Sequence, residues 1–325
     1  MNILFCSAGR RCELMKEFKA SAKEGSKLVT ADMSPYAPAL YMGDVHYLVP
    51  RIDDPAYIDR LLEICRKEKI QGVTTLIDPE IALLAQHKER FEALGVRVFC
   101  PEEQTAKLCF DKFEMFRFLK QAGIPTVQSW VDFPSFKEAL NRGEVSFPVF
   151  VKPRTGSGSV GARRVEDENT LQAAMEEDKT LMVQELMTGA DLDADVYVDA
   201  VSKKAVSAFT KRKLETRIGG ASKTVSFKDE RLFALIQRIA EALDFCGPVD
   251  MDFFYRDGTY YLSEINPRFG GAYLHAYGAG VDFFKRMEQN VQGEETLPVF
   301  GDYEEGVAML MYDSVVIVPP GALAE

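Results

Sequence analysis

The chain has 325 residues, 46% of them hydrophobic, which is enough to bury a large core spread over two or three domains. Its formal net charge of −11 excludes a protein that binds nucleic acid through an excess of Lys and Arg. The six cysteines lack paired metal-ligand spacing, the N-terminal apolar run is too short for a signal peptide and no apolar stretch reaches membrane-spanning length, so we expect a cytoplasmic protein with reduced thiols and no membrane partner.

The first hundred residues alternate between strand-like and helical segments. Short apolar runs such as NILFC (2–6), KLVTAD (27–32) and GVTTLI (72–77) are separated by amphipathic runs, among them DPAYIDRLLEICRKEK (54–69). This alternation predicts a parallel sheet whose strands are joined by crossover helices. We therefore expect a Rossmann-like domain over residues 1–105.

A different pattern begins near residue 105. The run TAKLCFDKFEMFRFLKQAGIP (105–125) predicts a helical stretch that ends at its Gly and Pro. Strand-like runs, a further helix and a strand-rich region from 193 to 210 follow it. These patterns predict an α/β protein whose second, α+β domain covers residues 106–295, and the last segment, 296–325, is expected to form a short returning strand or hairpin.

The segment VKPRTGSGSVGARRV (151–165) contains glycines with the spacing of a dinucleotide-binding fingerprint. The context excludes that use, because the glycines do not directly follow a strand and precede a short charged strand pattern instead of a helix. A loop of Gly and Ser between antiparallel strands can instead close its backbone N–H groups over phosphates, with Lys152 adding a positive charge. A hairpin tip without a ligand is the alternative.

The segment GPVDMDFFYRDGTYYLSEINPRFGG (247–271) has two strand-like runs around an Asp-Gly turn. A two-residue turn would pair residues whose numbers sum to 515, and it would turn Asp252 away from Glu264. A three-residue turn with a glycine bulge would give sums of 514. In that register four polar side chains share one face of the hairpin, namely Asp250, Asp252, Glu264 and Asn266.

Three carboxylates and an amide on one face repel one another unless a cation lies among them. Hard oxygen ligands are also what Mg²⁺ with bound phosphates requires, so this register predicts a metal site. Acidic residues on the solvated side of a hairpin are the alternative. Arg268, just beyond the hairpin, lies within reach of the same phosphates and can neutralise a phosphoryl group in transfer.

Together these segments resemble the ATP-grasp enzymes, and most of all the single-copy relatives of the carbamoyl-phosphate synthase large subunit. The resemblance covers residues 1 to about 295 and rests on four ordered motifs: FDKFEMFRFLKQAGIPT, FPVFVKPRTGSGSVG, VQELMTGADLDADV and VDMDFF…YLSEINPRFGG. It implies a pre-ATP-grasp domain over 1–105, a nucleotide lobe over about 106–185 and a metal-binding lobe over about 186–295.

The resemblance also implies roles for individual residues. Contacts with the ATP phosphates fall to Lys112 and Lys152, and the loop that folds over them contains Gly156, Ser157, Gly158, Ser159 and Gly161. Adenine binding falls to the hinge of Gln184, Glu185, Leu186 and Met187, and ribose binding to Asp191, where the family usually has Glu. Two Mg²⁺ ions, which Mn²⁺ could replace, fall to Asp252, Glu264 and Asn266. The phosphoryl group in transfer falls to Arg268, while Asp250 is expected to be structural.

Members of this family phosphorylate a carboxylate with ATP and let a nucleophile attack the acyl phosphate. We therefore expect an ATP- and Mg²⁺-dependent ligase that joins a small-molecule carboxylate to an amine or a thiol and releases ADP and phosphate. The alternatives are an enzyme that makes carbamoyl phosphate from bicarbonate and ammonia, an enzyme that stops at phosphoryl transfer, and a nucleotide-binding protein without catalysis. A nicotinamide oxidoreductase is least favoured. The chain has one such module whereas the synthase has two, which favours the ligase.

Substrate contacts are expected from two regions. In FTKRKLETRIGGASKTV (209–225), Lys211 and Arg217 are candidates for holding the substrate carboxylate or the acyl phosphate, and a solvated hairpin is the alternative. In the first domain, four side chains follow predicted strands, where open parallel sheets bind ligands: Arg10, Arg11, Asp78 and Glu80. Helix capping is the alternative for Asp78 and for Asp32. Whether the chain forms a homodimer is left open.

Overall fold

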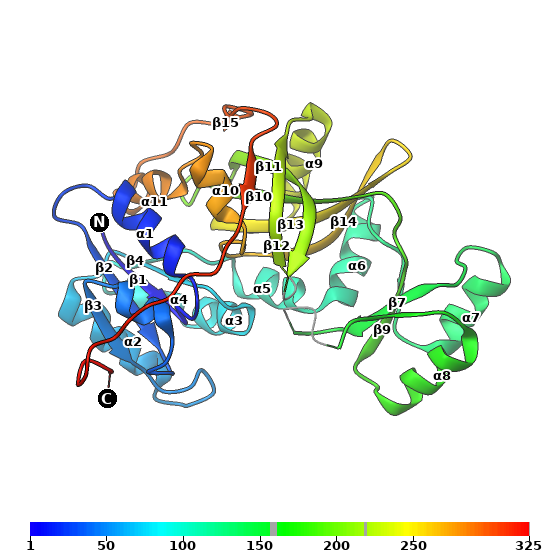
Figure 1. Ribbon diagram of the computed structural model, residues 1–325, viewed down its shortest axis with the longest axis horizontal. Coiled ribbons are helices and arrows are strands. Elements are labelled where there is room, and N and C mark those ends of the chain that lie inside the picture. The colour runs from blue at the N-terminus through cyan, green and yellow to red at the C-terminus, as the bar shows by residue number, and fades with distance from the viewer. Residues whose placement is uncertain (157–160, 218–219, 325) are drawn as a thin grey trace.

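The computed structural model describes residues 1–156, 161–217 and 220–324. They form three sheets with their covering helices (Figure 1). Ser157, Gly158 and Ser159 of the expected phosphate loop lie outside the described residues. In the described part of the chain, no helix has both the length and the apolar composition that crossing a membrane requires.

The N-terminal sheet is parallel and five-stranded, in the order β3-β2-β1-β4-β5. Its strands are β1 (Asn2–Cys6), β2 (Lys27–Asp32), β3 (Val45–Leu48), β4 (Gly72–Thr75) and β5 (Arg97–Val98). Its helices are α1 (Cys12–Ser21), the 3₁₀ helix η1 (Pro38–Met42), α2 (Tyr57–Glu68), α3 (Asp78–Gln86) and α4 (Lys88–Glu92). The expected Rossmann-like arrangement is confirmed. Because the chain order reverses between β1 and β4, the loops after these two strands flank the crevice where such sheets bind ligands.

Two helices and a small antiparallel sheet follow. The helical stretch expected over 105–125 is divided into α5 (Glu103–Phe110) and α6 (Lys112–Gln121), because the Asp111 side chain accepts the backbone N–H groups of Phe113 and Glu114 and so begins a new helix. The small sheet has the order β6-β9-β7-β8. Its elements are β6 (Ser129–Trp130), α7 (Phe133–Asn141), β7 (Val149–Pro153), β8 (Arg163–Val165), α8 (Glu168–Glu177) and β9 (Leu181–Glu185).

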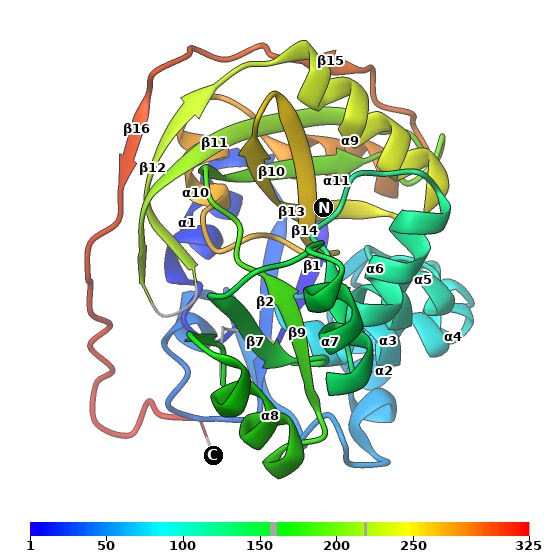
Figure 2. The same cartoon turned by 90° about the vertical axis from the view of Figure 1, so that its right-hand side faces the viewer.

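The large sheet has the order β14-β13-β10-β11-β12-β16, with β15 beside β11 (Figure 2). Its strands are β10 (Ala190–Val198), β11 (Ala205–Arg217), β12 (Gly220–Phe227), β13 (Gly247–Arg256), β14 (Thr259–Asn266), β15 (Val299–Phe300) and β16 (Ala308–Leu310). The helices are α9 (Glu230–Ala242), α10 (Tyr273–Gly278) and α11 (Phe283–Val291). The α/β fold class with a parallel N-terminal sheet and a two-lobed antiparallel part is therefore confirmed.

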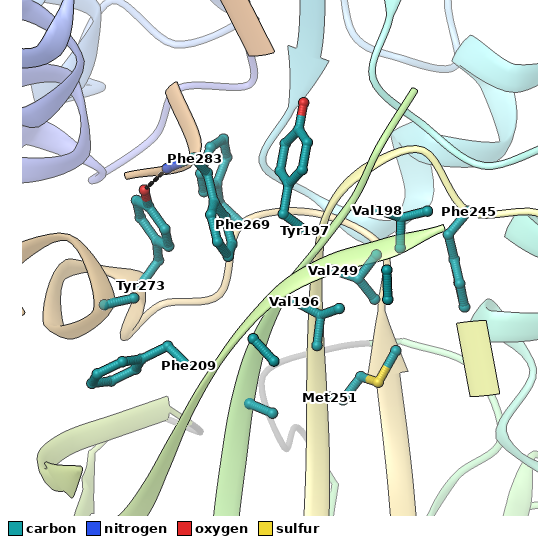
Figure 3. Packing of buried hydrophobic residues seen from close by; sticks show 14 of the residues in the cluster. Val196, Tyr197, Val198, Phe209, Phe245, Val249, Met251, Phe269, Tyr273 and Phe283 are labelled. Atoms are coloured by element: carbon teal, nitrogen blue, oxygen red, sulfur yellow. Dashed lines mark hydrogen bonds between the residues drawn. The ribbon is translucent and has the colours of Figure 1, made fainter. Parts of the chain in front are cut away.

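One apolar cluster joins the large sheet to the N-terminal domain. Val196 of β10 and Met251 of β13 lie in this cluster, and so does the aromatic group around Phe269 (Figure 3). The ring of Phe269 is 6.3 Å from that of Phe5 on β1, and Phe18 of α1 packs edge-on against α11. Because this packing crosses between the two sheets, the loops that end the parallel strands are held against the end of β14.

The segment after β15 lies along the edge of the large sheet and then runs to the N-terminal domain (Figure 1). The strand β16 pairs with β12, and the backbone N–H of Ala324 donates to the hydroxyl of Tyr41 across 3.3 Å. Several of its apolar side chains are exposed, including those of Tyr312 and Ile317.

Candidate active site

The two lysines expected at the phosphates come from different elements that converge. Lys112 begins α6, and its ammonium donates to the carbonyl of Gly156 across 2.6 Å. Lys152 lies on β7, largely buried, with its ammonium 3.9 Å from the Glu264 carboxylate. Gly156 and Gly161 have φ of +107° and +76°, values that favour glycine. The start of the glycine loop thus lies between α6 and the acidic hairpin.

The acidic hairpin has neither the expected turn nor the expected register, although the expected shared face is present. The turn is the two-residue Asp257-Gly258, with positive φ at both positions, so the expected three-residue turn is wrong. A β-bulge at Ser263 then adds one residue to β14 and shifts the pairing. As a result Asp252 lies opposite Glu264, and Asp250 lies opposite Asn266. The shared face is therefore present, because the bulge compensates for the shorter turn.

A small, open pocket joins this face to the glycine loop. Its lining includes Lys112 and Gly156 on one side and Glu264 and Asn266 on the other. The Asn266 amide nitrogen lies 3.4 Å from an oxygen of Asp250, which leaves the amide oxygen to bind a cation. Carboxylate and amide oxygens beside two ammonium groups fit a divalent cation carrying phosphates. The donor set therefore fits Mg²⁺.

Arg268 lies between two carboxylates, one from α3 of the N-terminal domain and one from β13 of the large sheet. Its guanidinium forms an ion pair with Asp78, in which Nη2 donates to Oδ2 across 3.0 Å and Nε lies 2.8 Å from Oδ1 without hydrogen-bond geometry, and Asp250 lies 3.9 Å away. Asp78 begins α3 but makes no side-chain cap, so the capping alternative for it is wrong. Burial opposes the charge of Arg268, yet Asp78 and Asp250 outweigh it and raise the pKa of Arg268. The guanidinium is thus a fixed positive charge beside the pocket.

Two charged layers lie on the strands that flank the hairpin. The outer charged layer consists of Asp191, Lys213 and Asp252; the inner charged layer consists of Asp193, Asp195, Lys211 and Asp250. In the outer layer the ammonium of Lys213 is 3.0 Å from Asp191 and also contacts Asp252. In the inner layer the ammonium of Lys211 is 3.2 Å from Asp193 and also contacts Asp195.

The inner charged layer is closed to solvent. The Lys211 side chain has no exposed surface, so the expectation that Lys211 holds a substrate is wrong: its ammonium neutralises buried carboxylates. Asp193, Asp195 and Asp250 bring carboxylate oxygens within 4.8 Å of one another, but Lys211 already supplies the cation there. This layer is an internal ion-pair network.

Arg217 does not reach the pocket either. Its side chain is exposed and pairs with Asp313 of the C-terminal segment at 2.9 Å, so the expected substrate role is wrong. Within 209–225 the basic residue that contacts the acidic hairpin is Lys213, which was not among the expected substrate-binding residues. Its signal was present, because Lys211 and Lys213 alternate on one strand as Asp191, Asp193 and Asp195 do on its neighbour.

Two segments of the chain match known protein families. Residues 109–272, half of the chain, match the ATP-grasp domain family. The chain belongs to the ATP-grasp family. Residues 3–99 match the family described as the PylC-like N-terminal domain. This ATP-grasp chain thus combines the family's domain with a PylC-like domain that carries Arg10, Arg11 and Asp78.

Two curated relatives of this ATP-grasp chain are distant and longer than the chain itself. A pyruvate carboxylase subunit of Methanothermobacter thermautotrophicus is 23% identical over 261 residues, covering 73% of this chain and 52% of that protein. The carbamoyl phosphate synthase large chain of Clostridium acetobutylicum is 22% identical over 227 residues, covering 65% of this chain and 21% of that protein. The chain therefore corresponds to part of each relative, and its similarity to the synthase is one distant similarity among several.

Solved structures share the whole fold. The biotin carboxylase domain dimer of the Hydrogenobacter thermophilus 2-oxoglutarate carboxylase, in complex with MgADP, ADP and bicarbonate, has a TM-score of 0.74 at 17% identity, covering 94% of this chain and 73% of that chain. The L-amino acid ligase from Bacillus licheniformis has a TM-score of 0.67 at 18% identity, covering 91% and 75%. At these identities the likeness establishes the fold.

The hinge expected for adenine spans the end of β9 and the two residues that follow it in this ATP-grasp chain. The Gln184 side chain is buried and its amide donates to Ser129 across 3.1 Å. Glu185 accepts the backbone N–H of Gln128 and pairs with Arg256 at 3.3 Å. Leu186 and Met187 continue the chain, half-buried. The first two side chains are thus held by protein groups.

The substrate candidates of the N-terminal domain differ in exposure. Arg10 is exposed after β1, whereas Arg11 donates to the Gly270 carbonyl across 3.0 Å. Burial and the nearby Arg268 lower the pKa of Arg11 to about 10. Asp32 accepts the N–H groups of Gly9 and Ser34 and so orders the loop after β1; the capping alternative for Asp32 is wrong.

Glu80 is too deeply buried to bind a substrate, so the expected substrate role is wrong. Its carboxylate is fully buried and accepts the hydroxyls of Ser7, Thr75 and Tyr57. Burial raises the pKa of Glu80 although these hydroxyls act in the opposite direction. With both oxygens engaged, Glu80 holds the loop after β1 against β4.

Proposed function

We propose that this ATP-grasp chain is an ATP- and Mg²⁺-dependent ligase that phosphorylates a small-molecule carboxylate and transfers the acyl group to an amine or a thiol. The observation that carries the proposal is the pocket in which Lys112 and Gly156 face Glu264 and Asn266. A carboxylate reacts with a nucleophile only after one oxygen becomes a good leaving group, and phosphate from ATP makes it one.

Each element then has a role. Lys112 and Lys152 hold the phosphates, the loop that includes Gly156 and Gly161 closes over them, and Gln184 to Met187 with Asp191 hold the nucleoside. Asp252, Glu264 and Asn266 hold Mg²⁺, which when bound neutralises phosphate charge and polarises the transferring phosphoryl group. Arg268 contributes a fixed charge for that group, and its position next to Arg11 directs the acceptor carboxylate towards the loop after β1.

The nucleophile approaches from the N-terminal domain in this proposal. Arg10 and Arg11 follow β1, at the crevice where the parallel sheet reverses its order, and Asp78 follows β4 at the same crevice. Asp78 is engaged with Arg268, so it acts through that guanidinium. Arg10 remains the exposed candidate for contact with a negatively charged part of either substrate.

A panel assay tests the proposal. Mg²⁺-dependent ADP release from ATP is measured with amino acids and other carboxylates, including bicarbonate, each with and without amines and thiols. A ligase releases ADP only when one carboxylate and one nucleophile are both present. ADP release with bicarbonate and ammonia alone would replace the proposal with carbamoyl phosphate formation, and release with a carboxylate alone would reduce it to phosphoryl transfer.

Two variants make the assay specific. Glu264→Gln removes a ligand charge from the pocket and is expected to abolish ADP release. Glu215→Gln changes the same residue type at an exposed position of β11, where it pairs with Lys223, and is expected to leave the rate unchanged. Equal rates in the two variants would contradict the assigned site.

A further inference from the structure

Lys213 lies beside the proposed metal and nucleotide site, and its ammonium contacts Asp252, one of the expected metal ligands. Its ammonium contacts the Asp252 carboxylate and is 3.0 Å from Asp191. The side chain is 14% exposed, so the ion pair is largely shielded from water. These contacts place a protein cation on the same oxygens that a divalent cation would use.

Strand pairing fixes this position. Arg212 of β11 pairs with Leu192 of β10, which brings the next residue, Lys213, level with Asp191. Asp193 of β10 pairs in turn with Asp252 of β13. Lys213 therefore reaches across β10 from one neighbouring strand to the other, and rotation of its long side chain moves the ammonium without any change in the sheet.

The ammonium is charged in this setting. The carboxylates of Asp191 and Asp252 on either side of the ammonium stabilise its positive charge. A divalent cation on Asp252 would lie within a few ångströms of this positive charge, and two like charges at such a distance in a shielded site repel strongly. The ammonium and the metal therefore compete for Asp252.

We propose that Lys213 is a resident counter-ion of Asp252, which excludes a divalent cation until the phosphates of a bound nucleotide draw the ammonium away. The inference rests on the proposed Mg²⁺·ATP site and adds an order to it: metal binds with the nucleotide and not before it. Once displaced, the ammonium pairs with the nucleotide phosphates, which lie on the same side of the hairpin as Lys152.

Lys211 cannot perform this task. It lies on the same face of β11 two residues away, but its side chain has no exposed surface and pairs with Asp193 and Asp195. Moving its ammonium would leave two buried carboxylates without a cation, which is strongly unfavourable. Asp252, by contrast, faces the partly open hairpin and gains the metal when it loses Lys213.

Titration of the full chain with Mn²⁺, followed by the electron paramagnetic resonance signal of the free ion, tests the inference without any substrate. Lys213→Met is compared with the parent chain and with Lys223→Met, which removes an exposed lysine on the neighbouring β12. Without nucleotide, Lys213→Met is expected to bind Mn²⁺ at least about tenfold more tightly than the parent. Lys223→Met is expected to match the parent.

The titration is repeated with a non-hydrolysable ATP analogue. The advantage of Lys213→Met should then fall below about threefold, because the phosphates have already withdrawn the ammonium in the parent chain. Equal or weaker Mn²⁺ binding by Lys213→Met without nucleotide would overturn the inference while leaving the proposed function intact. Failure of the parent to bind Mn²⁺ together with the analogue would overturn the proposed function itself.

A second variant guards against a folding defect. Lys213→Arg keeps the positive charge and is expected to bind Mn²⁺ as weakly as the parent when nucleotide is absent. Tight Mn²⁺ binding by Lys213→Arg would also overturn the inference, because charge would then not be what excludes the metal. Circular dichroism of each variant establishes that it is folded before the titration.

Discussion

The outer and inner charged layers are made of the same residue types on the same strands, yet they do different work. Each layer places a lysine of β11 against aspartates of β10 and β13. Lys211 of the inner layer has no exposed surface, whereas Lys213 and Asp252 of the outer layer are 14% and 26% exposed. Two residues along a strand thus separate an internal ion-pair network from a site that a ligand can reach.

The surroundings of an ion pair therefore decide whether it stabilises the fold or can exchange a partner for a ligand. A fully buried lysine cannot leave its carboxylates, so the inner layer fixes the positions of β10, β11 and β13. A lysine at the edge of a pocket can exchange its carboxylate partner for a phosphate. We therefore assign stability to the inner layer and ligand binding to the outer one.

The largest expected effect concerns Lys211. Lys211→Met leaves Asp193 and Asp195 buried without a cation and should lower the free energy of unfolding by about 3–5 kcal/mol. Lys213→Met should lower it less, by about 1–2 kcal/mol, because Asp191 and Asp252 are 39% and 26% exposed and water can solvate them once the lysine is gone. Urea unfolding at pH 7 measures both, and equal losses would erase the distinction between the layers.

The second prediction compares the two layers by their effect on the rate of ADP release, where the outer layer should matter more. Asp252→Asn removes a ligand charge from the hairpin face and should slow ADP release, with the substrate pair found in the panel, at least about 100-fold. Asp193→Asn, its pairing partner on β10, should slow release less than about tenfold. Steady-state rates with saturating MgATP give the ratio. A larger loss in Asp193→Asn would mean that the inner layer takes part in the reaction.

A carboxylate outside both layers, that of Asp199 just after β10, is held by hydrogen bonds instead of a lysine. Asp199 is fully buried; burial acts to raise its pKa, but donors including Asn290 and Thr296 outweigh it and lower the pKa from 3.8 to about 2. Because the folded value is the lower one, this stabilisation is present above about pH 4 and is lost as the pH falls towards 2.

Asp199→Asn should therefore lower the free energy of unfolding by about 2 kcal/mol at pH 7 and by about half as much at pH 3. Urea unfolding at the two pH values measures the difference. A loss that does not depend on pH would show that packing around Asn290, and not the charge of Asp199, provides the stability.

The smallest expected effect concerns the support of Arg268 from the N-terminal domain. Asp78→Asn keeps the shape of the side chain but removes the negative charge that pairs with Arg268, so Arg268 should be less firmly oriented. We expect the rate of ADP release to fall about tenfold while the affinity for the ATP analogue stays within about twofold. Weakened nucleotide binding with an unchanged rate would assign Asp78 to the nucleotide instead.

Local patterns carry much of the fold. The alternation of apolar and amphipathic runs over residues 2–98 gives the parallel sheet, because period and strand length are local properties. The register of the hairpin could not be predicted from the local sequence alone. The Asp257-Gly258 turn is a local signal, but the bulge at Ser263 depends on how β14 packs against β13. The shared acidic face was therefore expected from a three-residue turn, whereas the structure produces it with a two-residue turn and a bulge.

Contacts between residues that are far apart in the sequence could not be predicted from it. Asp78 and Arg268 are 190 positions apart, and Arg217 and Asp313 are 96 apart, so no local pattern indicates either pair. The depth of a residue is also a property of the folded chain, which is why Lys211 was preferred to Lys213. The cluster of basic residues in 209–225 indicated the right strand, but only the folded packing distinguishes the buried Lys211 from the partly exposed Lys213.

The central claim is that the pocket between the glycine loop and the acidic hairpin binds Mg²⁺ and ATP together. Calorimetric titration of the full chain with a non-hydrolysable ATP analogue, with and without Mg²⁺, tests it most directly. The account predicts that Mg²⁺ tightens analogue binding at least about tenfold in the parent chain and that Glu264→Gln loses this gain. Analogue affinity that is the same with and without Mg²⁺, or a gain that persists unchanged in Glu264→Gln, would contradict it.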